Sequence, residues 1–277
     1  MANLFHIILY HIIHFFYSIH LSVTRAWSWA TQYINERIAS PPSCQIIHHD
    51  LAPLPKKPHH LTVVLPRLES EQQLGDTIRD IAMLACWCVE ARIAFLSIYE
   101  SSGKIKHEID AITKEIARLK IKWFGEEDKH QVKVGAMSLL NGVKYVNGLK
   151  PTNGKYSTLH QYSPDLNVIL LSHEDGYRHV VEATKSICQS VNHGDIAEKE
   201  ISMELVDDRI SASFSEPNLM IVLSNTRWPD QPLRLYGYPP WHIRLTEIIH
   251  VAAPRISYRV FRNALYRYAR VEQRFGR

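Results

Sequence analysis

The sequence has few cysteines and little excess charge of either sign. Its four cysteines form no Cys-x-x-Cys pair, so neither a dense disulfide framework nor a cysteine-rich zinc site is indicated. Free cysteine is usually buried, and we predict reduced core thiols at Cys44, Cys86, Cys88 and Cys188. The net charge of +4 is too small and too evenly spread for a nucleic-acid-binding surface, which gathers Lys and Arg on one face.

Several catalytic signatures are also missing. There is no Gly-x-Gly-x-x-Gly or Walker loop, the glycine-rich turns that hold nucleotide phosphates. There is no His-Glu-x-x-His zinc motif and no Gly-x-Ser-x-Gly nucleophile elbow. The pairs His48-His49 and His59-His60 lie in a proline-containing segment and are interpreted as solvated side chains. Nucleotide-dependent, zinc-protease and serine-hydrolase chemistries are therefore not indicated.

Residues 4–23 contain no Asp, Glu, Lys or Arg. About 20 such residues form a helix that spans a hydrocarbon core of ~30 Å. A cleaved signal peptide fits less well, because no basic residue precedes the apolar run. Arg25, the nearest charge, places the following domain on the cytosolic side. A tilted or interfacial helix is the alternative, because histidine is costly in a bilayer and the segment contains His6, His11, His14 and His20.

Composition divides the chain into three regions. Residues 1–30 are predicted to be a membrane anchor with an interfacial segment that contains two tryptophans. Residues 31–59 are predicted to be a linker, because they contain five prolines and no sustained apolar period. Residues 60–277 are predicted to form one large α/β domain.

Short apolar runs alternate with helical patterns in that domain. Strands are predicted at residues 61–65, 93–99, 166–171 and 219–223. Apolar residues at three- and four-residue steps predict helices near residues 74–89, 105–119, 175–191, 201–212 and 257–275. Glycines and prolines between residues 142 and 164 predict a loop-rich insertion. Strands that alternate with helices require crossover connections, which predicts a mostly parallel central sheet flanked by helices.

Two segments near the C-terminus are distinctive: Pro239-Pro240-Trp241-His242-Ile243-Arg244-Leu245-Thr246-Glu247-Ile248 and Glu272-Gln273-Arg274-Phe275-Gly276. With Ala85-Cys86-Trp87-Cys88 and Ser97-Ile98-Tyr99-Glu100, they resemble the Nogo-B receptor family, the accessory subunits of eukaryotic dehydrodolichyl diphosphate synthase. The resemblance implies the cis-prenyltransferase fold, similar to that of undecaprenyl diphosphate synthase. Together with the apolar N-terminus, it implies a location in the endoplasmic reticulum membrane, with the domain facing the cytosol.

The sequence departs from the catalytic members of that fold at two places. In those enzymes Mg²⁺ and cationic groups stabilise the charge on a leaving diphosphate, and the first strand ends in Asp-Gly-Asn. Here that strand runs into Leu65-Pro66-Arg67, and Val222 replaces a phosphate-binding arginine. Glu247 matches a family position, but without its metal-binding companion it is interpreted as structural. The resemblance therefore implies a chain that is inactive alone and has no metal site of its own.

The C-terminal tail has two possible interpretations. By composition it is a basic helix end with a glycine cap. Guanidinium groups also bind phosphate oxygens bidentately, and glycine permits close backbone approach. The resemblance favours the second interpretation, in which Arg274 and Gly276 are catalytic and substrate-binding residues contributed to a partner's active site.

The implied partner is a catalytic cis-prenyltransferase subunit in a heterodimer or a higher heteromer. This partner would provide most of the Mg²⁺ ligands. The complex would condense farnesyl diphosphate with several isopentenyl diphosphates to make the polyprenyl precursor of dolichol for protein glycosylation. The helices near residues 201–212 and 257–275 are candidates for the interface. Two alternatives stay open: a membrane receptor or scaffold without a catalytic role, and a self-sufficient homodimeric synthase.

Overall fold

The computed structural model describes residues 2–38, 42–127, 129–138, 142–145, 165–211, 215–225 and 232–272. The chain divides into two compact units, Met1–Pro41 and Pro42–Arg277. Arg274 and Gly276 lie outside the described residues.

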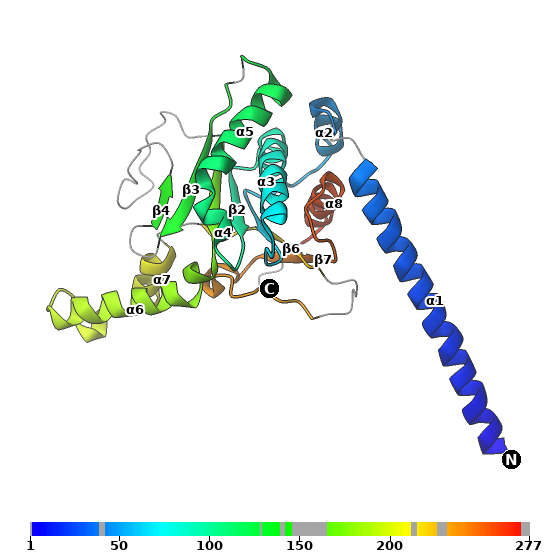
Figure 1. Ribbon diagram of the computed structural model, residues 1–277. Coiled ribbons are helices and arrows are strands. Elements are labelled where there is room, and N and C mark those ends of the chain that lie inside the picture. Colours follow the sequence, from blue (N-terminus) through cyan, green and yellow to red (C-terminus); the bar gives the residue numbers. More distant parts are fainter. Residues whose placement is uncertain are drawn as a thin grey trace. The chain divides into compact units, whose positions relative to one another are not determined.

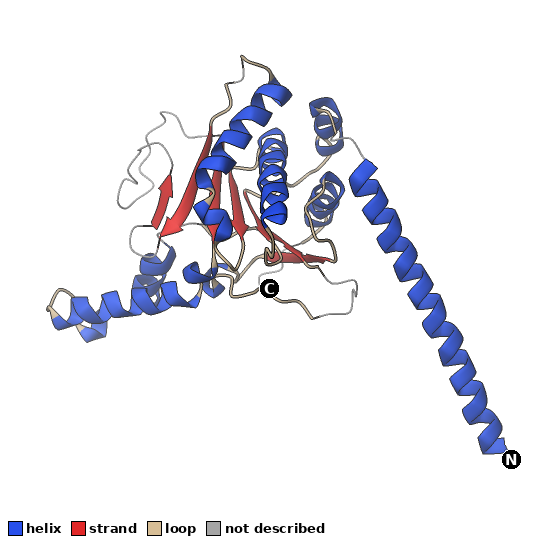
Figure 2. Cartoon of the chain, in the orientation of Figure 1, coloured by secondary structure: helices blue, strands red, loops and turns tan. Residues whose placement is uncertain are grey.

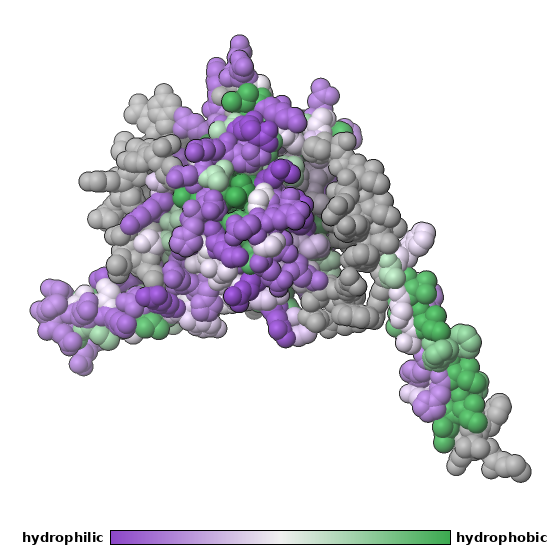
Figure 3. All heavy atoms as spheres, in the orientation of Figure 1, coloured by the Kyte–Doolittle hydropathy of each residue, from purple (hydrophilic) through white to green (hydrophobic). Residues whose placement is uncertain are grey.

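The first unit is one helix, α1 (Ala2–Ile38). Its 37 residues extend for about 55 Å at 1.5 Å per residue. The stretch His6–Thr24 is long and apolar enough to cross a membrane, by length and composition. Its large apolar side chains are exposed, including Phe15 and Phe16, and Figure 3 shows this stretch largely in green. The predicted N-terminal apolar helix is therefore present, and the helix continues past residue 30.

The second unit is built on a seven-stranded sheet in the order β4-β3-β5-β2-β1-β6-β7 (Figures 1 and 2). The strands are β1 (His60–Val64), β2 (Phe95–Tyr99), β3 (Val132–Ser138), β4 (Gly142–Tyr145), β5 (Leu166–Leu171), β6 (Leu219–Leu223) and β7 (Glu247–Val251). All neighbouring pairs are parallel except β3 with β4. The prediction of an α/β fold with a mostly parallel sheet is confirmed.

Helices and short 3-10 turns connect the strands. The helices of this unit are α2 (Cys44–Leu51), α3 (Glu71–Ala91), α4 (Lys104–His107), α5 (Ile109–Phe124), α6 (Tyr177–Asn192), α7 (Met203–Ser211) and α8 (Tyr258–Ala269). The 3-10 turns are η1 (His173–Asp175), η2 (Glu198–Glu200) and η3 (Pro240–His242). α3 begins at a capping box in which Ser70 and Gln73 satisfy each other's backbone N–H groups.

The sheet separates two apolar cores. Because strand side chains alternate between faces, Leu61 and Val63 of β1 join the core that α2, α3, α5 and α8 cover, whereas Val64 joins the opposite core. That opposite core is covered partly by an irregular segment, whose Tyr238 packs edge-on against Tyr99 at 5.4 Å between ring centroids. An irregular segment therefore covers part of this core, whereas helices cover the core on the other face of the sheet.

The structure differs from the expectation for residues 31–59. This segment, predicted to be a linker, contains the end of α1 and all of α2, and Ile47 and Leu51 of α2 are buried in the domain core. Pro42 and Pro53 flank α2 without interrupting it, as proline does at helix ends. An eight-residue helix has too few turns to show an apolar period, so the pattern did not reveal it.

Three further details depart from the prediction. β3 and β7 were not predicted, and β4 lies within the expected loop-rich insertion. Cys86 and Cys88 are buried as expected and Cys44 is partly buried, but Cys188 is exposed on α6, so the prediction of a core thiol there is wrong. His60 is buried, so its interpretation as a solvated side chain is also wrong. The strand β7 begins at the end of the distinctive segment 239–248, and its five residues include Glu247 and His250, so no sustained apolar run marks it.

Candidate functional site

The carboxyl ends of β1, β2 and β5 meet at one edge of the sheet, because these strands are parallel neighbours. Ligands of open α/β sheets usually bind outside this edge. The residues that follow the three strands are Leu65, Glu100 and Ser172. These residues are therefore the first candidates for a ligand-binding site.

Glu100 is fully buried at the carboxyl edge. Its Oε1 accepts hydrogen bonds from the backbone N–H of Ser102 at 2.8 Å and of Leu68 at 3.4 Å. Its Oε2 accepts from the Ser102 hydroxyl at 2.6 Å, and the Lys104 Nζ donates to the Leu68 carbonyl at 3.3 Å. The carboxylate thus ties the loops that follow β1 and β2, and both of its oxygens are engaged.

Asp175 is the second buried carboxylate at this edge. Lys106 Nζ lies 2.9 Å and 3.0 Å from its two oxygens, and the backbone N–H of Ser172 donates to it at 2.7 Å. Burial raises the pKa of Asp175, and the hydrogen bonds and charge of Lys106 oppose that rise. Asp175 is therefore a partner of Lys106 within the fold.

This arrangement does not fit Mg²⁺, which needs several oxygen ligands in near-octahedral geometry. Within the described part of the chain, no group of three or more His, Cys, Asp or Glu could hold a metal ion. The carboxylate oxygens of Glu100 and Asp175 accept hydrogen bonds from other groups of the protein. Glu247 does not join them, because it is the first residue of the parallel strand β7 and so lies at the opposite edge of the sheet.

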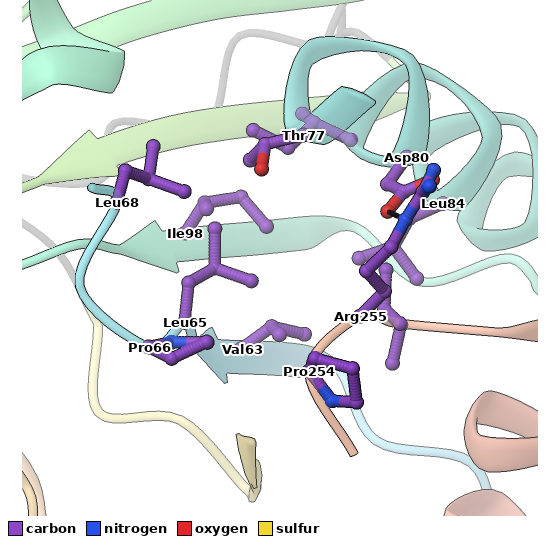
Figure 4. Close-up of a pocket in the computed structure, with 12 residues that line it drawn as sticks. Val63, Leu65, Pro66, Leu68, Thr77, Asp80, Leu84, Ile98, Pro254 and Arg255 are labelled. Carbon is purple, nitrogen blue, oxygen red and sulfur yellow. Dashed lines mark hydrogen bonds and ion pairs between the residues drawn. The ribbon is translucent and has the colours of Figure 1, made fainter. Parts of the chain in front are cut away.

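An apolar space lies between α3 and strands β1 and β2, lined by side chains that include Val63, Leu84 and Ile98 (Figure 4). Its volume is about 20 Å³, about the room that one water needs. Arg255 closes one side by donating to Asp80, with Nε to Oδ2 at 2.7 Å and Nη2 to Oδ1 at 2.6 Å. Burial raises the pKa of Asp80 and Arg255 lowers it. This space has no room for a prenyl chain.

A larger open hollow of about 420 Å³ lies near the ends of β3 and η1. Its charged lining has two cations and three carboxylates, namely Lys106, Arg178, Glu174, Asp175 and Glu182. A diphosphate is strongly anionic, so a lining with this balance does not favour it.

Polar side chains of segment 239–248 contact α7. The Trp241 indole N–H donates to Asp207 of α7 at 2.7 Å, and Arg244 lies 3.2 Å from the same carboxylate. His242 is buried, and burial lowers its pKa to about 4. These contacts fix the segment to α7. Val222, which the resemblance matches to a phosphate-binding arginine, is 1% exposed within β6.

Sequence reasoning assigned no role to Asp175, to the pair formed by Asp80 and Arg255, or to Glu100, although Glu100 ends one of the segments that carry the resemblance. One signal was available for Asp80, because it sits between Ile78 and Ile81 on the apolar side of a predicted helix. The others follow strand ends, where loops carry polar residues for many reasons. Their engagement with the protein became visible only from the contacts.

No family model matches the chain. The chain is 28% identical over 266 residues to the dehydrodolichyl diphosphate synthase complex subunit nus1 of Schizosaccharomyces pombe, covering 92% of this chain and 94% of that protein. It is 29% identical over 226 residues to the NUS1 subunit of Homo sapiens, covering 81% of this chain and 68% of that protein. The chain is a homologue of the NUS1 (Nogo-B receptor) subunits.

The homology to NUS1 extends across most of the chain and confirms the resemblance seen in its motifs. Among solved structures, lavandulyl diphosphate synthase from Lavandula x intermedia, in complex with dimethylallyl diphosphate, is similar with a TM-score of 0.54 and 17% identity. The match covers 80% of this chain and 99% of that one. It shows that this NUS1 homologue has a cis-prenyltransferase-like fold.

Proposed function

We propose that this chain is a non-catalytic subunit required for the activity of a membrane-bound dehydrodolichyl diphosphate synthase complex. The homology to NUS1 subunits over 92% of the chain carries the proposal. The complex would condense farnesyl diphosphate with isopentenyl diphosphates to make the polyprenyl precursor of dolichol. The apolar stretch His6–Thr24 would anchor it in the endoplasmic reticulum membrane, with the domain in the cytosol.

The geometry of the carboxyl edge supports inactivity of the chain alone. Elongation needs a space for the growing prenyl chain, whereas the space between α3 and the sheet measures about 20 Å³. It also needs a metal and cationic groups for the leaving diphosphate. Glu100 and Asp175 are engaged within the fold, and Val222 is apolar and buried. The catalytic partner would therefore provide the metal-binding Asp, most of the Mg²⁺ shell and the prenyl pocket.

The C-terminal tail is the part of this chain assigned to the chemistry. Arg274 would bind isopentenyl diphosphate oxygens through its guanidinium group, which can form two parallel hydrogen bonds. Gly276 would present its backbone N–H to the same group, since it has no side chain to prevent close approach. Both residues would act in the partner's active site.

An uncharged stripe on α6 is the surface proposed for the partner. Tyr177 is 66% exposed and Val181 is 50% exposed, and the exposed Thr184 and Cys188 continue the same helical face. Apolar side chains that are exposed side by side on one helical face can mark a protein interface. The candidate interface on α8 fits less well, because its apolar residues Phe261 and Leu265 are already buried in the domain core.

Reconstitution tests the proposal. The chain would be purified alone and co-expressed with a catalytic cis-prenyltransferase subunit, and each sample assayed with Mg²⁺, farnesyl diphosphate and labelled isopentenyl diphosphate. We expect sustained elongation only from the complex. Elongation by the chain alone would support the self-sufficient synthase, and a partner fully active without this chain would support the scaffold.

The matched variants Arg274→Ala and Arg277→Ala distinguish a specific role of Arg274 from an effect of the tail's positive charge. Each variant removes one arginine from the same tail. We expect Arg274→Ala to lower turnover of the complex by about 100- to 1000-fold, as loss of one charge-stabilising group does. Arg277→Ala should stay within about twofold of the unmodified complex, and both variants should co-purify with the partner. Equal turnover of the two variants would reject the assignment of Arg274.

A further inference from the structure

Three donors from α8 converge on one residue of α2, Asp50. The hydroxyl of Tyr258 donates to Oδ2 of Asp50 at 3.1 Å, and Nη1 of Arg262 lies 3.3 Å from the same oxygen. The hydroxyl of Tyr266 donates to the backbone carbonyl of Asp50 at 2.7 Å. The donors are spaced by four residues and therefore form one stripe on α8. We call these contacts the Asp50 clasp.

The helix α2 is itself held firmly by the domain. Ile47 is 0% exposed and Leu51 is 1% exposed, both within the core that α3 and α8 share. His48 contacts Glu90 of α3 at 3.1 Å, and the thiol of Cys44 donates to the carbonyl of Trp123, in α5, at 3.2 Å. α2 is therefore a fixed reference to which the clasp attaches α8 (Figure 1).

The apolar contacts of α8 are not the only contacts that hold its position along its axis. Phe261 and Leu265 are buried, but apolar attraction is non-directional. Hydrogen bonds are directional, so the three hydrogen bonds of the Asp50 clasp favour one register and one rotation of α8. α8 ends at Ala269, five residues before Arg274, and its register decides where the tail begins.

We propose that α2, through Asp50, positions α8 so that the tail begins where Arg274 can reach the diphosphate in the partner's site. This inference rests on the proposed function of the tail. Asp50 is a positioning residue, since it touches α8 and acts through it. The first helix of the domain would thereby control a chemical group contributed by the last residues of the chain.

The test uses the full-length chain co-expressed with its catalytic partner. Asp50→Ala removes the carboxylate that Tyr258 and Arg262 contact, while Gln45→Ala changes an exposed residue on the same helix. With turnover normalised to the amount of complex recovered, we expect Asp50→Ala to lower turnover about 3- to 10-fold and to raise the KM for isopentenyl diphosphate. Gln45→Ala should leave both values unchanged.

A double-variant cycle distinguishes positioning from a general loss of stability. In the Arg274→Ala background, Asp50→Ala should cause no further loss of turnover, because the group that it positions is gone. A merely structural role would lower turnover by the same factor in both backgrounds. That result would overturn the inference, as would an Asp50→Ala complex with unchanged turnover beside a crippled Arg274→Ala complex.

A gentler variant covers the case in which Asp50→Ala does not fold. Tyr258→Phe combined with Tyr266→Phe removes two of the three contacts and keeps both rings, including the packing of Tyr258 on Trp87 at 5.5 Å between centroids. We expect the same dependence on Arg274, with a smaller loss of turnover. If Arg274→Ala itself is fully active, the proposed function fails and the positioning role fails with it.

Discussion

A Cβ atom added to Gly176 would lie 2.2 Å from the carbonyl oxygen of Gly237. Gly176 joins η1 to α6, and Gly237 lies in the irregular segment that covers the second core. Gly237 has a φ of +85° and would itself bring a Cβ within 2.8 Å of His173. The two glycines allow this segment to lie directly on the carboxyl edge of the sheet, beside Asp175.

We expect Gly176→Ala to destabilise the domain by about 1–3 kcal/mol, the usual cost of overpacking, because the obstructing atom belongs to the backbone and cannot rotate away. Unfolding of the detergent-solubilised chain in urea would measure it. Gly75→Ala is the matched control, since nothing lies within 4 Å of a Cβ in the helical position of Gly75. That variant should be neutral or stabilised by up to about 1 kcal/mol. Equal midpoints for the two variants would contradict the close approach.

Arg255→Ala should destabilise the domain by about 2–3 kcal/mol. It leaves the carboxylate of Asp80, whose side chain is 7% exposed, without its bidentate partner. The expected cost is below the 3–5 kcal/mol of a fully buried broken pair, because Arg255 is 45% exposed and partly screened by solvent.

Two further variants test whether the unpaired carboxylate of Asp80 causes the loss of stability in Arg255→Ala. Asp80→Leu combined with Arg255→Ala should recover part of the lost stability, because no buried charge is left. Arg79→Ala should change stability by less than about 0.5 kcal/mol, since its 3.9 Å contact with Asp76 is an exposed ion pair. A loss as large for Arg79→Ala as for Arg255→Ala would reject this explanation.

His60 makes stability depend on pH below neutrality. It is buried and contacts the hydroxyls of Ser97 at 2.7 Å and Ser215 at 3.0 Å, and burial lowers its pKa to about 3. Between that value and the unfolded pKa of ~6.5, the unfolded chain binds one more proton than the folded chain, so the free energy of unfolding decreases as pH falls. The His60 contribution is fully present above pH ~6.5.

The variant His60→Asn tests this sign. Between pH 6 and pH 4, the free energy of unfolding should fall more steeply for the unmodified chain than for His60→Asn. The difference between the two slopes should be up to about 1.4 kcal/mol per pH unit. Above pH 7 the two curves should run parallel. Identical slopes at pH 4–6 would show that His60 is not held neutral by burial.

Val181→Asp should prevent assembly if the stripe on α6 binds the catalytic partner, because a charge would have to be desolvated in the interface. Co-purification with the partner would measure it, and we expect at least a tenfold loss of recovered complex. Ile121→Asp is the matched control: Ile121 lies on α5 and is 55% exposed, close to the 50% of Val181. Equal recovery of the two variants would exclude this stripe as the interface.

The α/β class, the apolar N-terminal helix and most of the helices could be predicted from the sequence. These features rest on local patterns, such as the apolar run of β1 and the three- and four-residue steps of α3. The resemblance to the Nogo-B receptor family also came from short segments, and comparison with known proteins confirmed it over most of the chain. The roles of Arg274 and Gly276 stay predictions.

The sequence by itself also determined that the first strand runs into Leu65 and Pro66, with no Asp-Gly-Asn. Only the tertiary structure decided that Glu100 and Asp175 are turned inward, and that Arg255 closes a small apolar space between α3 and the sheet. The same holds for α2, whose Asp50 contacts Tyr258 across 208 positions of the chain. Such contacts depend on which distant segments fold together, and no local periodicity carries that information.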